Sequence, residues 1–139
     1  MNATILGLLG YISWILVLLV SLACYRTGLV MQKQKAPNAF KADGSDSPPF
    51  GARITRALGN SVESFAFIGG LMLLALATNS AVITDGLALM LLAARLGQSI
   101  THLISTSVLA VQVRFAFFLV QVGICVFWTV KFALKFVAI

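Results

Sequence analysis

Four long apolar runs dominate the sequence and leave a chain of this length few ways to fold. Each is long enough for a membrane helix, which needs about 20 apolar residues, and they cover residues 4–25, 53–78, 81–106 and 107–136. Hydrophobic residues make up 60% of the chain and charged residues only 10%, a composition unlike that of soluble globules. The runs are continuous, whereas the strands of an outer-membrane barrel alternate polar and apolar residues. The sequence therefore predicts an all-α integral membrane protein, a single four-helix bundle over residues 1–139.

The one long polar segment, residues 26–52, predicts how the chain is oriented. With its flanks it holds six of the ten basic residues, Arg26, Lys33, Lys35, Lys41, Arg53 and Arg56. Cytoplasmic loops of membrane proteins carry an excess of Lys and Arg. We therefore expect this loop in the cytosol and both termini on the non-cytoplasmic side, in a bacterial inner membrane or a membrane of endoplasmic-reticulum type. Topology accounts for the net charge of +6, and the basic residues are not interleaved with aromatics as in nucleic-acid-binding surfaces.

Polar residues recur inside the second and third runs at helical spacing. Intervals of three and four residues predict one polar face on each helix, formed by Arg53, Arg56, Asn60 and Glu63 in the second run and by Arg95, Gln98 and His102 in the third. Charged side chains at membrane depth cost at least about 2.5 to 3.5 kcal/mol each, so they need partners or a function. The two helices are antiparallel, and Glu63 and Arg95 each lie about ten residues from a cytoplasmic helix end. We therefore expect these two side chains to meet.

Together the two faces predict a polar cleft that opens to the cytosol. Arg114, near the start of the fourth run, adds a further cation, so that cations outnumber the single carboxylate. This imbalance favours an anionic ligand with carboxylates and leaves Glu63 to bind an amine. An ion pair that only joins two helices would account for Glu63 and Arg95 but not for the other polar residues. Cys24 and Cys125 show no metal-ligand spacing, so no metal site is predicted.

The stretch from Pro48 to Glu63 reads PPxxxRxxRAxxNxxE. It resembles the second-helix motif of the MAPEG family, the membrane-associated proteins of eicosanoid and glutathione metabolism. Arg95, with a polar residue seven positions later, is similar to the family's third-helix motif, and the four-span layout extends the resemblance over essentially the whole chain. That later residue is His102, where the family usually has tyrosine.

The resemblance implies a homotrimer that binds glutathione, as a cosubstrate, in a cytosol-facing cleft between neighbouring subunits. By position, glutathione would be held by Arg56, Asn60 and Glu63 with Arg95 beside them, and Arg53 and Gln98 complete the candidate binding set. The catalytic candidates are Arg114, which would stabilise the thiolate, and His102. A neutral histidine ring donates one hydrogen bond and so could replace the hydroxyl of the missing tyrosine.

The sequence thus predicts a glutathione-dependent membrane transferase or peroxidase that acts on hydrophobic electrophiles from the bilayer. Glutathione brings its own thiol, whose pKa of about 8.5 nearby positive charge would lower, so no protein nucleophile is needed. Two alternatives stay open. One is a small proton-coupled multidrug transporter that uses a membrane carboxylate, for which Glu63 is the candidate. The other is an inactive binding protein of the same fold, in keeping with histidine at position 102.

Overall fold

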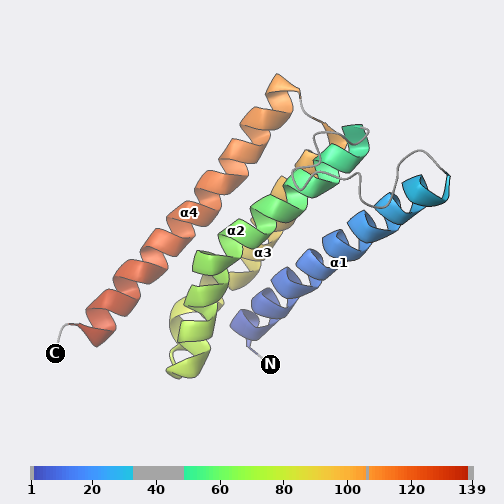
Figure 1. Cartoon of the computed structure of the whole chain (residues 1–139). Coiled ribbons are helices and arrows are strands. Elements are labelled where there is room, and N and C mark those ends of the chain that lie inside the picture. Colours follow the sequence, from blue (N-terminus) through green and yellow to red (C-terminus); the bar gives the residue numbers. More distant parts are fainter. Residues whose placement is uncertain (1, 33–48, 106, 138–139) are drawn as a thin grey trace.

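Four long helices make up the computed structural model, which describes residues 2–32, 49–105 and 107–137 (Figure 1). They are α1 (Ala3–Met31), α2 (Pro49–Ala77), α3 (Ala81–Ile104) and α4 (Val108–Phe136). All four are long and apolar enough to cross a membrane. The predicted all-α chain with four candidate membrane spans is therefore confirmed for the described residues.

The helices beside the polar segment are longer than hydropathy alone suggests. α1 continues to Met31 and α2 begins at Pro49, so both helices extend into the segment of about residues 26–52 that was predicted as the loop. The last residues of α1, Gly28 to Met31, are apolar or small and allow the helix to continue. Proline suits the first position of a helix because its φ is already helical and its missing N–H would have no helical partner there.

Side-chain caps and one left-handed residue define the other helix ends. Asn2 begins α1, since its Oδ1 accepts from the backbone N–H of Ile5 at 2.8 Å, and Ser107 begins α4 in the same way, accepting from Ala110 at 3.2 Å. Between α2 and α3, Asn79 has a φ of 57°, a region that asparagine tolerates better than most residues. α2 ends at Ala77, one residue before the end of the second apolar run.

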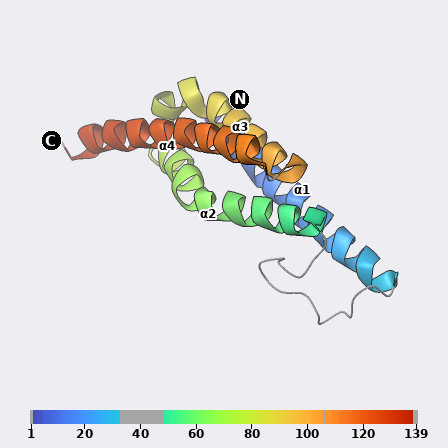
Figure 2. The same cartoon turned by 90° about the horizontal axis from the view of Figure 1, so that it is seen from above.

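The core is built around α2 and α3, which lie between α1 and α4 (Figure 1). Its largest fully buried side chains include Tyr11 of α1, Met72 of α2 and Trp128 of α4. α3 packs along both α1 and α4, whereas α2 touches α4 over only a short stretch. Figure 2 shows the last turns of α1 projecting away from the other helices. The limited contact between α2 and α4 leaves room for a groove between them.

The two ends of the bundle differ in what they carry. One end of the bundle, here called the loop end, holds the last residues of α1 and α3 and the first residues of α2 and α4. Both chain termini lie at the opposite end (Figure 1). The expectation that the loop end faces the cytosol stays a prediction. Three of the lysines on which it depends, Lys33, Lys35 and Lys41, lie outside the described residues.

Candidate functional site

Arg95 of α3 is a fully buried charge held by neutral groups. Its Nε donates to Oε1 of Gln121 at 2.8 Å, its Nη1 donates to Oδ1 of Asn60, and its Cζ lies 5.7 Å from the centre of the Tyr11 ring. Its Nη2 is buried and has no hydrogen-bond partner. Within the part of the chain that the structure describes, no carboxylate neutralises this guanidinium. Its positive charge is therefore uncompensated.

Glu63 does not meet Arg95, contrary to the prediction. It is exposed on α2 and forms no ion pair within the described ranges. The reason is helical rotation: at about 100° per residue, a spacing of three leaves Glu63 about 60° away from Asn60 around the helix axis. Asn60 faces Arg95, so Glu63 turns outward. The partner that sequence reasoning missed is Gln121, for which the only signal was a glutamine within a long apolar run.

Three amide side chains connect α2, α3 and α4 around Arg95. Gln121 donates from Nε2 to Oε1 of Gln98 at 2.7 Å and to the carbonyl of Phe117 at 3.0 Å. Gln98 in turn donates from Nε2 to Oδ1 of Asn60 at 3.3 Å. Because Oδ1 of Asn60 accepts from both Gln98 and Arg95, its orientation is fixed. The amide nitrogen of Asn60 then remains available as a donor.

The two predicted catalytic residues, Arg114 and His102, lie in contact. Nη1 of Arg114 is 2.9 Å from Nδ1 of His102 and 3.3 Å from its Nε2. Since a guanidinium can only donate, the bonded ring nitrogen acts as the acceptor. The tight connection between α3 and α4 brings these side chains together although α3 and α4 are separate helices. His102 thus orients the guanidinium of Arg114.

A polar cavity of about 290 Å³ lies between α2, α3 and α4. Its polar wall consists of Asn60, Gln98, His102 and Arg114, and its apolar wall of Val111, Phe115 and Phe118. Arg114 supplies a positive charge at the wall, and Arg95 supplies a second one directly behind Asn60. None of the described residues that line it is acidic. The cavity therefore suits an anion.

An apolar cavity of about 350 Å³ adjoins the polar one farther from the loop end. It is lined mainly by apolar residues of two helices, Phe67 and Leu71 of α2 and Phe118, Val122, Cys125, Val126 and Thr129 of α4. Phe118 belongs to the walls of both cavities. The two cavities together are called the α2–α4 groove below. It is polar toward the loop end and apolar toward the opposite end.

A comparison with protein families finds one that spans this fold. The MAPEG family model matches residues 9–134, nearly the whole chain. The chain belongs to the MAPEG family. The predicted membership of this family is thereby confirmed. No curated protein and no solved structure matches the chain.

Arg56 and Glu63 of this MAPEG chain lie on the outer surface of α2. They are seven residues apart, which places them within about 20° of each other around the helix, and both are exposed. Asn60 and Phe67 mark the side of α2 that lines the α2–α4 groove, and the two charged residues are rotated a further 20° to 60° or so outward. They border the groove without lining it. One chain alone therefore does not enclose all of the predicted binding residues.

Arg53 is separated from the α2–α4 groove. Its Nε donates to the carbonyl of Leu103 at 2.9 Å, and its Cζ lies 5.8 Å from the centre of the Phe50 ring. Leu103 belongs to the last turn of α3, where carbonyl groups have no helical partner. A cation is also favoured at the negative end of the helix dipole. Arg53 thus stabilises the end of α3 in this MAPEG chain, and the geometry lends no support to its predicted role in binding glutathione.

Proposed function

We propose that this MAPEG protein is a glutathione-dependent membrane transferase or peroxidase that acts on hydrophobic electrophiles. The observation that supports this function best is the α2–α4 groove, in which a cationic polar cavity adjoins an apolar cavity at Phe118. A polar anionic thiol would occupy one half and an apolar substrate the other, so that they meet beside Phe118. Phe67 and Val126 are exposed on the helix surfaces, and a substrate dissolved in the bilayer can approach the apolar half between them.

The polar cavity offers groups that match the chemistry of glutathione, which carries two carboxylates, one ammonium and one thiol. Arg114 provides charge for the thiolate, and the free amide nitrogen of Asn60 provides a donor. Arg56 and Glu63 border the cavity and would bind a carboxylate and the ammonium. The buried charge of Arg95 acts through Asn60, in a low-dielectric environment where electrostatic interactions are stronger than in water.

We further propose that the site is completed by a second copy of the chain in a homotrimer. The polar cavity, at about 290 Å³, is slightly smaller than the usual range for small-molecule sites, about 300 to 1,000 Å³. The outer face of α2 has exposed charged and small residues, among them Arg56, Gly59, Glu63, Ala66 and Gly70. Small residues let membrane helices approach closely, and charges at membrane depth require cover. A neighbouring subunit on this face would satisfy both requirements.

The transferase reaction then needs only orientation and charge from the protein. The thiolate sulfur of glutathione attacks the electrophilic carbon, a carbon–sulfur bond forms, and the leaving group departs with its electron pair. The proton of the thiol passes to water. Arg114, oriented by its contact with His102, stabilises the thiolate and so raises the fraction of the reactive form at neutral pH.

Calorimetry of the purified protein in detergent tests the proposal. Glutathione is expected to bind, and Arg114→Gln or Asn60→Ala is expected to weaken binding about tenfold or more, as for the loss of a hydrogen bond to a charged group. Lys131→Gln is the matched control, because it removes a cation from the same helix at the opposite end. This variant should bind glutathione as the unmodified protein does.

Three other outcomes would lead to different conclusions. Absence of glutathione binding would refute the proposal. Binding without conjugation of an aryl halide would identify an inactive binding protein of the same fold. Proton-driven uptake of a cationic drug into proteoliposomes, lost in Glu63→Gln, would identify a transporter.

A further inference from the structure

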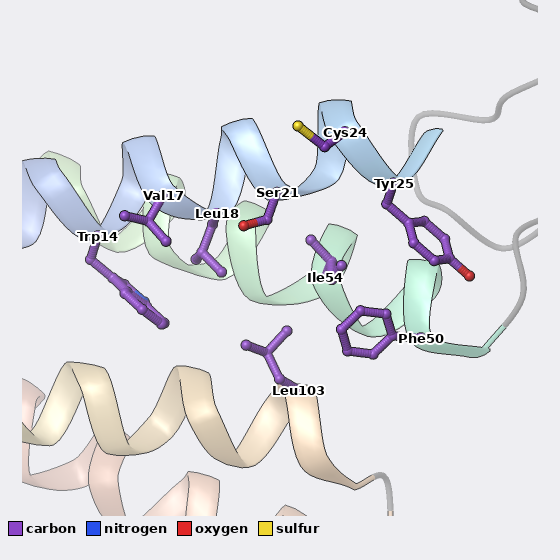
Figure 3. Close-up of a pocket in the computed structure, with 9 residues that line it drawn as sticks. All are labelled: Trp14, Val17, Leu18, Ser21, Cys24, Tyr25, Phe50, Ile54 and Leu103. Carbon is purple, nitrogen blue, oxygen red and sulfur yellow. The ribbon is translucent and has the colours of Figure 1, made fainter. Parts of the chain in front are cut away.

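A third cavity lies on the other side of the bundle, between α1, α2 and α3 at the loop end (Figure 3). Its volume is about 480 Å³, and its lining includes Trp14, Leu18, Tyr25, Phe50, Ile54 and Leu103. In Figure 3, α1 and α3 form its two sides, and the side chains of Trp14 and Leu103 point into the space between them. This cavity is called the α1 groove. It shares no lining residue with the α2–α4 groove.

The α1 groove is apolar and open to the surroundings of the helices. Val17 and Cys24 line it and are exposed, so the groove reaches the outer surface of the bundle. Tyr25 and Phe50 contact each other edge-on at the loop end, with ring centres 5.7 Å apart. Tyrosine is enriched where membrane meets water, which places this end at the interface and the rest of the groove among the lipid chains. A groove at that depth is filled by apolar chains because water is excluded there.

A fixed cation closes the interfacial end of the groove. Two groove residues hold the guanidinium of Arg53, Leu103 through its carbonyl and Phe50 through its ring. Only Nε of Arg53 is used in these contacts, and its two Nη groups make no hydrogen bond to the described residues. Such a pair of donors in fork geometry matches a phosphate group. Among the residues that the structure describes, no carboxylate lines the groove to compete with an anion.

We propose that the α1 groove binds an anionic phospholipid from the leaflet at the loop end, with one acyl chain in the groove and the phosphate at Arg53. The apolar slot and the fixed arginine match the two parts of such a lipid. A zwitterionic phospholipid carries the same phosphate together with a cationic group that Arg53 repels, so the anionic headgroup is preferred. This site does not depend on the function proposed for the α2–α4 groove.

Tryptophan quenching tests the proposal on the full chain without glutathione. The chain has two tryptophans, and Trp128→Phe leaves Trp14, in the wall of the groove, as the only one. The variant is reconstituted in phosphatidylcholine vesicles that contain lipids with brominated acyl chains, which quench tryptophan on contact. Brominated phosphatidylglycerol is expected to quench Trp14 at about one-fifth of the mole fraction needed for brominated phosphatidylcholine, the preference that one arginine supplies at a membrane surface. Equal quenching by the two lipids would overturn the proposal.

Three substitutions, each in the Trp128→Phe background, locate the site. Arg53→Gln is expected to abolish the preference, whereas Arg56→Gln, which removes the same charge from the outer face of the same helix, is expected to keep it. Because Arg53→Gln could also disturb the end of α3, Ser21→Phe serves as a second, independent test. Its side chain fills the groove, toward which Ser21 points in Figure 3, and Arg53 stays in place. Loss of the preference in Ser21→Phe supports the proposal, and its persistence in either Ser21→Phe or Arg53→Gln refutes it.

Discussion

Gln121 determines how the charge of Arg95 is accommodated inside an apolar bundle. It is fully buried, accepts from Nε of Arg95 and donates to Gln98. A carboxylate at this position would neutralise the guanidinium of Arg95. An amide accepts a hydrogen bond from the guanidinium but does not neutralise its positive charge. The positive charge behind Asn60 is therefore retained because its partner at position 121 is neutral.

Replacing Gln121 with leucine is expected to lower the free energy of unfolding by about 2 kcal/mol. The substitution leaves Nε of Arg95 and the carbonyl oxygen of the Gln98 amide without the hydrogen-bond partner that Gln121 supplies. Thermal unfolding in detergent, followed by circular dichroism, measures the loss. Gln112→Leu changes an exposed glutamine of the same helix and should have little effect. An equal loss in the two variants would contradict the role assigned to Gln121.

His102 is expected to act as an acceptor for Arg114 rather than as a base. His102→Phe removes the acceptor and should lower kcat for glutathione conjugation about tenfold, whereas His102→Tyr, whose phenol oxygen also accepts, should retain most of the activity. Steady-state kinetics with an aryl halide separate kcat from KM. If the tyrosine variant is as impaired as the phenylalanine variant, the imidazole has a role that a hydrogen-bond acceptor cannot supply.

Asp85 connects the start of α1 to α3, two elements far apart in the sequence. Its Oδ1 accepts from the backbone N–H of Thr4 at 3.0 Å and from the hydroxyl of Thr4 at 2.6 Å. The same hydroxyl contacts that of Thr84 at 2.5 Å. The carboxylate thus satisfies a free N–H group in the first turn of α1, where the helix dipole also favours negative charge.

Asp85→Ala is therefore expected to destabilise the protein by about 1 kcal/mol, the usual effect of losing a helix cap. Asp85→Asn keeps an oxygen acceptor and should lose clearly less. Denaturant unfolding of both variants in mixed micelles checks the order. Equal losses would indicate that the charge, and not the hydrogen bonds, stabilises the start of α1.

The helices were predictable from hydropathy, but their rotation about their own axes was not. The spacing of Arg53, Asn60 and Glu63 suggested one polar face, because intervals of three and four residues both return near the same side. In the structure this face is divided: Arg53 contacts the end of α3, Asn60 contacts Arg95, and Glu63 turns outward. Deviations of about 20° to 60° decide which neighbour a side chain meets, and they depend on packing between helices.

The start of α2 and the contacts that α4 makes could not be predicted, for a different reason. Hydropathy reports which residues prefer lipid, so it could not show that α2 begins at Pro49. Gln121 carries no charge and lies in a strongly apolar run, where nothing in the sequence distinguishes it from a lipid-facing residue. The contact between His102 and Arg114 depends on the close return of α4 along α3, which spacing along one helix does not reveal.

At the scale of the whole molecule, most of the outer surface suits a lipid bilayer, and the outer face of α2 is the exception. Large apolar side chains are exposed along all four helices. On α2, Arg56 and Glu63 interrupt this apolar surface, and Gly59 and Gly70 lie beside them with no atom close to where a Cβ would be. Contact with another copy of the chain would cover the charges and use the space that the glycines leave.

Gly70→Leu is therefore expected to weaken the proposed trimer, so that about tenfold more protein is needed to assemble it in detergent. The midpoint concentration of a trimer varies with the square root of its dissociation constant, so this shift corresponds to a loss of about 2.8 kcal/mol for the whole trimer. Mass photometry or native mass spectrometry over a dilution series measures the shift. Gly86→Leu adds the same side chain at an exposed glycine of α3 that also has open space around it. It should leave assembly unchanged because α3 presents no outward charge at that position. Equal weakening in the two variants, or assembly that Gly70→Leu does not affect, would place the subunit contact on a different helix, and Arg56 and Glu63 would then need another partner at membrane depth.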